Sequence, residues 1–266
     1  MFGAIIGDIA GSRFEFNNTF RKDFTLFHPN CEFTDDTVMT CAVAQALLDW
    51  EGDETELSRC AISAMQRIGR LYPNCGYGAR FYHWVFAQRP EPYDSCGNGS
   101  AMRISPVGLF AGSVEEAKRL SAAVTRVSHD HPEGMKGAEA VAVAMVMARQ
   151  GSGKAEIREL VERDFYPDIR SVTYYRETCG GHGKEICQVS VPQAFASFLE
   201  GEDFEDVIRN CISIGGDSDT IAAIGGGLAE AFYGVPQDLV DGARAYLDER
   251  LLAICDAFQA RLAQRD

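Results

Sequence analysis

The segment Phe33-Thr34-Asp35-Asp36-Thr37-Val38-Met39-Thr40 places two adjacent carboxylates between hydroxyl side chains. An apolar run follows directly, and its spacing predicts an amphipathic helix that begins at the two acids. The simplest explanation of this pattern is a helix cap, in which Thr34 or Asp35 accepts hydrogen bonds from free amides of the first turn.

A second segment, Gly215-Gly216-Asp217-Ser218-Asp219-Thr220, has the same chemistry and also leads into an apolar run. Two such turns, far apart in the sequence, suggest that their acids meet in space. Carboxylate and hydroxyl oxygens suit Mg²⁺, Mn²⁺ or Ca²⁺ better than Zn²⁺. Four or five clustered carboxylates would repel one another unless cations neutralised them, so we expect a site for two divalent ions. The spacing of a helix–loop–helix calcium site is absent.

Two further segments complete a set of four motifs. They are Gly7-Asp8-Ile9-Ala10-Gly11-Ser12-Arg13-Phe14-Glu15 near the N-terminus and Gly97-Asn98-Gly99-Ser100-Ala101-Met102-Arg103 in the middle of the chain. Together with the two acidic turns, and in the same order, they resemble the motifs of the ADP-ribosylglycohydrolases. This family includes relatives of the dinitrogenase reductase-activating enzyme.

This resemblance implies a metal-dependent hydrolase that cleaves the glycosidic bond between ADP-ribose and an acceptor. The expected partner is an ADP-ribosylated substrate, most simply a protein side chain such as arginine. The implied cofactors are two Mg²⁺ or Mn²⁺ ions, one held by Thr34, Asp35 and Asp219 and the other by Asp36, Asp217 and Thr220. Asp35 and Glu15 are the candidates for the general base. The implied substrate-binding residues are Asp94, Gly97, Asn98, Gly99, Ser100, Met102 and His129.

The Gly97–Ser100 segment can also be interpreted from its residues alone. Two glycines around Asn98 let backbone amides approach a ligand closely, although a plain connector would have the same composition. For His129, a surface or supporting position is the alternative to a substrate contact. The glycine-rich segment Gly180–Gly183 is expected at the mouth of the pocket.

Two other functions are compatible with parts of the sequence. The doublet His129-Asp130 suggests an all-α HD-type metal phosphohydrolase, with His83 and a downstream Asp as further ligands, but this reading leaves both acidic turns unexplained. A catalytically inactive relative that only binds ADP-ribose is the second alternative, and nothing in the sequence favours it, because the expected ligands are all present.

Composition limits the remaining possibilities. The 266 residues are 46% apolar and 24% charged, which predicts a single globular domain spanning residues 1–266. A net charge of −14 without a Lys/Arg cluster argues against general nucleic-acid binding and against attraction to anionic membranes. The nine cysteines form no C-x-x-C pair and predict reduced thiols in a cytoplasmic protein. Neither a signal peptide nor an apolar stretch long enough to span a membrane is expected.

Apolar periodicity predicts helices throughout and no strand, hence an all-α fold. The expected architecture is a compact, single-domain, multi-helix orthogonal bundle with the metal site in a central cleft. Gly3, Gly7 and Gly11 share one face of the first helix and predict close contact with another backbone, and the run Gly225-Gly226-Gly227 suggests a close helix crossing. Pro192 is expected in the first turn of a helix over residues 193–199.

Overall fold

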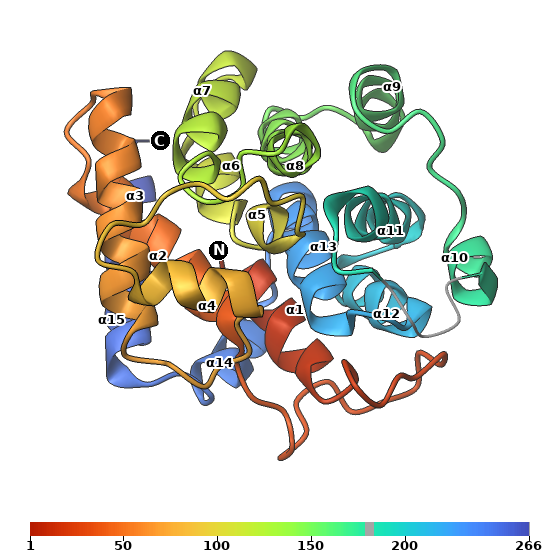
Figure 1. Cartoon of the computed structure of the whole chain (residues 1–266). Coiled ribbons are helices and arrows are strands. Elements are labelled where there is room, and N and C mark those ends of the chain that lie inside the picture. Colours follow the sequence, from red (N-terminus) through yellow and green to blue (C-terminus); the bar gives the residue numbers. More distant parts are fainter. Residues whose placement is uncertain (179–183, 266) are drawn as a thin grey trace.

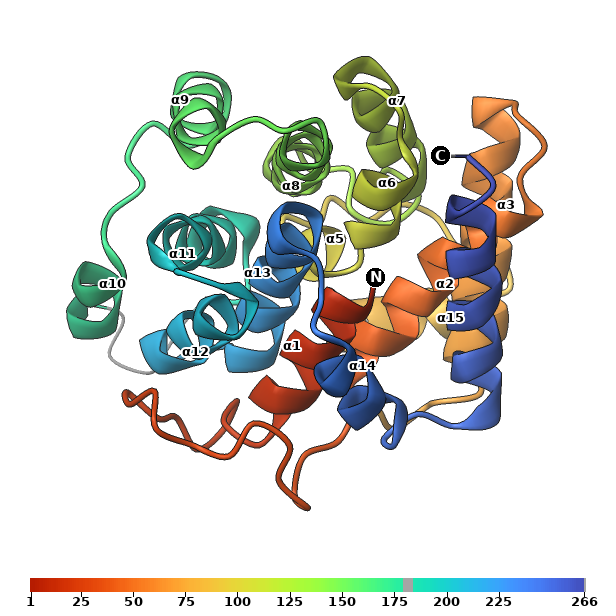
Figure 2. The same ribbon diagram turned by 180° about the vertical axis from the view of Figure 1, so that it is seen from behind.

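Two helices from opposite ends of the sequence lie side by side at the centre of the molecule. The computed structural model describes residues 1–178 and 184–265, and in it α1 (Phe2–Ser12) packs along α13 (Ser218–Tyr233) (Figures 1 and 2). A Cβ atom on Gly3 would lie 2.1 Å from the Gly226 carbonyl oxygen, and one on Gly7 would lie 2.0 Å from that of Ala222. The predicted close contact and the predicted crossing at the triple glycine are therefore confirmed, and they are one and the same contact.

The remaining helices surround this pair. α11 and α12 pack on one side of α13, while α2 packs with α3 and α15 on the other side of the molecule (Figure 1). The bounds of these and the other helices are α2 (Asp35–Asp49), α3 (Glu54–Gly69), α4 (Ala79–Phe86), α5 (Gly99–Met102), α6 (Ser105–Phe110), α7 (Val114–Thr125), α8 (Pro132–Arg149), α9 (Lys154–Asp164), α10 (Val172–Thr178), α11 (Cys187–Glu200), α12 (Phe204–Ile214), α14 (Gln237–Arg244) and α15 (Glu249–Leu262).

The all-α class is confirmed. Across the described residues there is no strand, and the only β-type pairing is an isolated bridge between Gly97 and Ile186. One hydrophobic core extends from α1 to α15. None of the described helices combines the length and the apolar character needed to cross a lipid bilayer.

One helix begins earlier than its sequence predicts. α11 starts at Cys187, so Pro192 lies inside the helix and not in its first turn. Proline has no amide hydrogen, and the carbonyl of Gln188 therefore lacks its usual donor four residues later. The side chains of Cys187, Val191 and Phe195 are fully buried, and this packing favours the longer helix despite the lost bond.

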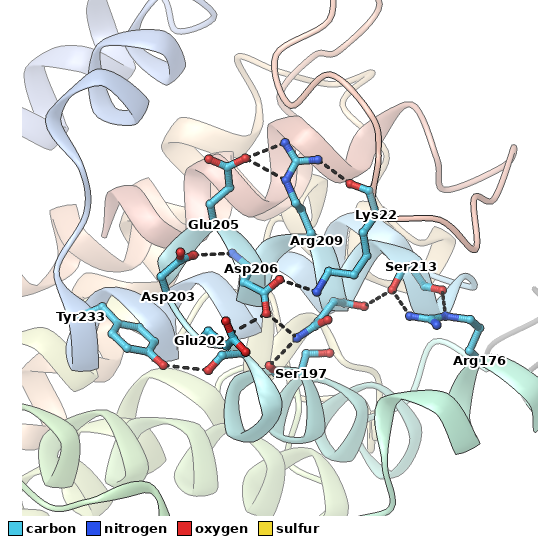
Figure 3. Close-up of polar contacts among 12 residues, drawn as sticks. Lys22, Arg176, Ser197, Glu202, Asp203, Glu205, Asp206, Arg209, Ser213 and Tyr233 are labelled. Atoms are coloured by element: carbon cyan, nitrogen blue, oxygen red, sulfur yellow. Dashed lines mark hydrogen bonds and ion pairs between the residues drawn. The ribbon is translucent and has the colours of Figure 1, made fainter.

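The loop that follows α1 is attached to α12 through the backbone of Lys22 and Phe24. Arg209 donates hydrogen bonds to the carbonyl oxygens of Lys22 (2.6 Å) and Phe24 (2.8 Å), and its guanidinium pairs with Glu205 (Figure 3). The Lys22 ammonium pairs with Asp206 of the same helix. This attachment matters for the site because the loop begins beside Glu15.

Candidate functional site

The first acidic turn is held in place by a carboxylate of α1. Asp8 is completely buried and accepts hydrogen bonds from the backbone amides of Thr34 (2.9 Å) and Thr37 (3.0 Å) and from the Thr34 hydroxyl (2.7 Å). The Thr34 hydroxyl in turn accepts from the Asp36 amide at 3.3 Å and caps α2, as the sequence predicts. Asp8 thus orients the whole turn that carries Asp35 and Asp36.

The second acidic turn depends on two glycines. Gly215 and Gly216 have φ angles of 80° and 76°, in the left-handed region that glycine adopts without steric cost. The side chain of Asn18 makes two hydrogen bonds to Gly216, with its nitrogen 2.9 Å from the carbonyl oxygen and its oxygen 3.1 Å from the amide. The side-chain amide of Asn98 donates a hydrogen bond to a carboxylate oxygen of Asp217 (2.5 Å). Asn18 and Asn98 therefore fix this turn from two different segments.

The two turns meet, as their chemistry predicts. The Thr220 hydroxyl lies 3.3 Å from an Asp36 oxygen. Ligating atoms of Asp8, Asp36 and Asp219 lie within 4.8 Å of one another, and those of Glu15, Asp217 and Asp219 do the same. Asp219 belongs to both groups. This grouping joins Asp36 with Asp219, whereas the partition implied by the resemblance assigns these two residues to different ions, and Asp35 lies in neither group.

The electrostatics of this cluster is unfavourable for uncompensated carboxylates. Burial, followed by repulsion from neighbouring acids, raises the pKa values of Asp36 and Asp219 well above their ordinary range. Burial raises the pKa of Asp8 to about 6, and burial together with Asp217 raises that of Glu15 to about 7. One oxygen each of Asp36 and Asp219 is buried without a hydrogen-bond partner. Such oxygen-only donors fit a hard divalent cation, which would satisfy them and offset the repulsion.

A cavity of about 280 Å³ opens above this cluster. Most of the predicted site residues line it, namely Glu15, Asp35, Asp36, Gly97, Asn98, Gly99, Met102, His129, Asp217, Asp219 and Thr220. The other walls include the side chains of Arg80, Phe81, Tyr93, Ser95, Arg103 and Glu185. The cavity therefore joins an acidic floor to a glycine-containing loop and an aromatic, cationic wall.

Three predicted residues do not line this cavity. Thr34 is buried behind its wall, where it bonds to Asp8. Asp94 is exposed, and its backbone has a φ angle of 52°. Its backbone amide donates a hydrogen bond to the Asp130 carboxylate (2.7 Å). Ser100 is completely buried, and its hydroxyl lies 2.9 Å from the Gly134 carbonyl oxygen, so its side chain supports the loop from behind.

His129 is separated from the acidic groups. Its ring packs against those of Phe81 and Tyr93, with centroids 6.0 and 5.7 Å away. Burial, reinforced by the nearby charge of Arg103, lowers the pKa of His129 well below its usual value. His83 is exposed on α4, and no histidine belongs to either group of potential metal ligands found among the described residues. The HD-type alternative therefore lacks its ligand set.

Several residues of the site were missed in the sequence, including Asp8, Arg103 and Glu185 and the aromatic and polar wall residues Arg80, Phe81, Tyr93 and Ser95. Asp8 and Arg103 lie within the quoted motifs, and a charged residue inside an otherwise small and apolar run is the signal that could have identified them. Glu185 follows the Gly180–Gly183 segment, which lies outside the described residues, and no local pattern marks it. Its carboxyl pKa is raised by burial and by Asp217.

Comparison with known proteins agrees with this geometry. The model of the ADP-ribosylglycohydrolase family matches residues 1–266. The chain is similar to human ADP-ribosylhydrolase ARH3 (27% identity over 94% of this chain and 90% of that protein). It is also similar to the ADP-ribosyl-[dinitrogen reductase] glycohydrolase of Rhodospirillum rubrum (25% identity over 83% of this chain and 75% of that protein).

The fold is shared with a solved structure as well. The chain superimposes on an ADP-ribosylglycohydrolase-related protein complex with a TM-score of 0.71 and 24% identity, covering 96% of this chain and 94% of that one. The family match over the full length, the shared fold and the converging acidic turns lead to one conclusion: the chain belongs to the ADP-ribosylglycohydrolase family.

Proposed function

We propose that this protein is a metal-dependent ADP-ribosylglycohydrolase that hydrolyses the bond between ribose C1″ of ADP-ribose and an acceptor group. The observation that carries the proposal is the convergence of two helix N-termini, which brings Asp36, Asp217 and Asp219 together beneath one cavity. Membership of the family supports the same reaction class.

Two Mg²⁺ or Mn²⁺ ions are the proposed cofactors. Asp36, Asp217 and Asp219 would hold them, with Asp8 and Glu15 close enough to contribute. Thr34, Asp35 and Thr220 are the further ligands that the family resemblance implies. The unsatisfied oxygens of Asp36 and Asp219 support this assignment. When bound, the ions would supply positive charge that binds ribose hydroxyls and lowers the pKa of water.

The side chains of the cavity have complementary tasks in this reaction. Glu15 lines the cavity and is the first candidate to accept a proton from the water that attacks C1″, with Asp35 as the second. The bond from C1″ to the acceptor breaks through an oxocarbenium-like transition state, its electron pair leaves on the acceptor, and the proton taken from water is then passed to the acceptor. Asn98, Gly99 and His129 hold the ribose and phosphates in the orientation that this attack requires.

An arginine side chain of a protein is the proposed acceptor. The carboxylate of Glu185, which lines the cavity and is not among the proposed metal ligands, would complement a guanidinium group. The name of the Rhodospirillum rubrum relative also identifies a protein, dinitrogen reductase, as its ADP-ribosylated substrate.

The same proposal describes residues 1–266 as one catalytic domain in the cytoplasm. A single core and a full-length family match support one domain. The cytoplasmic location rests on the cysteine pattern of the sequence, which has no C-x-x-C pair.

A panel of ADP-ribosylated substrates tests the proposal. ADP-ribose attached to arginine, serine, a nucleobase and a small alcohol would each be incubated with the protein in Mg²⁺ or in excess chelator. We expect the protein to release ADP-ribose from the arginine conjugate and not from the other three. This release should occur in Mg²⁺ and not in excess chelator. Binding of ADP-ribose without release from any linkage would instead identify an inactive relative.

A further inference from the structure

We propose that Arg103 and Ser128 fix the tautomer of His129, so that its Nε2–H group donates a hydrogen bond into the cavity, to a phosphate oxygen of ADP-ribose. The identity of this ligand rests on the proposed function. The tautomer is a property of the free protein and can be tested separately. Arg103 and Ser128 are thus positioning residues, which act on the substrate through His129.

The environment of Arg103 is the first observation. Its side chain is the largest of the completely buried ones, with 1% of its surface exposed. Within residues 1–178 and 184–265, no carboxylate pairs with it, and its Nε and Nη1 atoms have no hydrogen-bond partner. Its guanidinium carbon lies 5.2 Å from the centre of the Phe81 ring. Tyr93 and Asp35 act on its charge without forming an ion pair with it, and a buried cation without a paired carboxylate is costly, so its position calls for a function beyond packing.

Among the described residues, the side chain of Arg103 forms hydrogen bonds with Ser128 and His129. Nη2 of Arg103 lies 2.7 Å from the Ser128 hydroxyl oxygen and 3.4 Å from Nδ1 of His129. The Ser128 hydroxyl lies 2.9 Å from the same Nδ1 atom. These three side chains form a short chain of contacts that ends on one nitrogen of the imidazole ring.

The direction of these bonds follows from the chemistry of arginine. A guanidinium group can only donate, so the Ser128 oxygen accepts from Nη2. The hydroxyl hydrogen is then free to point at Nδ1. Nη2 of Arg103 also faces Nδ1 and cannot accept a hydrogen bond, so Nδ1 is the acceptor, and a neutral imidazole then carries its hydrogen on Nε2. The lowered pKa of His129 agrees with a neutral ring.

The remaining ring nitrogen faces the glycine-containing loop. A Cβ atom on Gly97 would lie 3.4 Å from Nε2, and one on Gly99 would lie 3.3 Å from it. The absence of side chains at these two positions leaves room for a ligand atom beside the ring. None of the described residues forms a hydrogen bond with Nε2. A donor that is oriented but unused within the protein suits an anionic oxygen of the substrate.

The imidazole ¹⁵N resonances of the metal-free protein test this arrangement directly. They distinguish protonated from unprotonated ring nitrogens, and comparison with the His129→Gln variant would assign the signals of His129. We expect an unprotonated Nδ1 and a protonated Nε2 in the wild type. Arg103→Met and Ser128→Ala should each shift His129 toward a mixture of tautomers, whereas Ser128→Thr, which keeps the hydroxyl, should restore the wild-type pattern.

Titration with ADP-ribose connects the tautomer to binding. We expect Arg103→Met and Ser128→Ala to bind ADP-ribose about tenfold more weakly, which corresponds to the loss of about one hydrogen bond. Ser128→Thr should bind it with near wild-type affinity. Should Arg103→Met fail to fold, the two Ser128 variants decide the question. A hydrogen on Nδ1 in the wild type, or an unchanged tautomer in both disrupting variants, would overturn the proposal. If no variant, including the wild type, bound ADP-ribose, the proposed function would fail while the tautomer result stood.

Discussion

The hydroxyl of Thr220 lies 3.3 Å from the carboxylate of Asp36, a contact that joins residues 184 positions apart in the sequence. Each residue lies in the first turn of its helix, and both helices contact α1. The site therefore depends on how closely α1 approaches α2 and α13.

Replacing Asp8 by alanine should destabilise the first acidic turn. Two buried amides and the Thr34 hydroxyl would lose their acceptor, and we expect the free energy of unfolding to fall by about 3 kcal/mol. Mg²⁺ affinity should fall as well, because Asp36 would no longer be oriented. Urea unfolding and calorimetry would measure both effects. Unchanged values for both would show that Asp8 is not the anchor of the turn.

A side chain at Gly7 should disrupt the central helix pair. The Cβ of Gly7→Ala would lie 2.0 Å from the Ala222 carbonyl oxygen, so the helices would have to separate. We expect the free energy of unfolding to fall by about 3 kcal/mol or more. Gly153→Ser is the matched control, since the nearest atom to its Cβ, apart from the chain neighbours, is 3.9 Å away and serine is a good helix cap. Equal stability of the two variants would contradict this account of the packing.

The stability of the metal-free protein should decrease as the pH rises from about 6.5 to 8. The folded-state pKa of Glu15 is raised to about 7, above its unfolded value, so the protonated folded form is favoured and this contribution is lost as pH rises through 7. His129, whose folded pKa is lowered, contributes in the opposite direction, and this contribution fades as the pH rises past about 6.5, its ordinary pKa. Thermal unfolding across this range should show the trend.

Two comparisons identify the origin of this pH dependence of stability. Glu15→Gln should weaken the pH dependence, because the titrating carboxyl is removed while the shape is kept. Saturating Mg²⁺ should flatten it further, since bound cations keep the carboxylates ionised. A metal-free protein whose stability increased over this pH range would contradict the electrostatic description of the cluster.

Valine at Gly99 should impair ADP-ribose binding without affecting the metals. Its Cβ would lie 3.3 Å from Nε2 of His129, and its methyl groups would fill the space beside the ring. We expect ADP-ribose affinity to drop at least about tenfold, the equivalent of one lost hydrogen bond. Calorimetry with ADP-ribose and then with Mg²⁺ measures the two sites in turn. Normal ADP-ribose binding would mean that the loop is only a connector.

The sequence was most informative where a local pattern carries the chemistry. The acids of both turns could be predicted at helix starts because hydroxyl and carboxylate caps have a local signature, and the close approach of α1 could be predicted from the spacing of Gly3, Gly7 and Gly11. The meeting of the two turns was predicted from their matching Asp and Thr residues, because clustered carboxylates and hydroxyls suit a shared cation site.

What the sequence did not reveal depends on tertiary contacts. The role of Asp8 exists only because α1 passes behind Thr34, and the chain from Arg103 to His129 needs α5 and the end of α7 to be adjacent. Asp94 was expected near the substrate, but it is exposed and does not line the cavity. The early start of α11 reflects burial of Cys187 and Val191, which local proline rules do not include.

The central claim is that the paired acidic turns form a metal-dependent glycohydrolase site, and the most direct test is the rate of ADP-ribose release from an ADP-ribosylated arginine protein in Mg²⁺. Asp219→Asn removes the carboxylate shared by both groups of ligands, while Asp238→Asn changes an exposed acid in the first turn of α14. We predict that Asp219→Asn loses release by at least about a hundredfold, a loss typical of removing essential charge from an active site, while Asp238→Asn retains the wild-type rate. Wild-type release by Asp219→Asn would contradict the account.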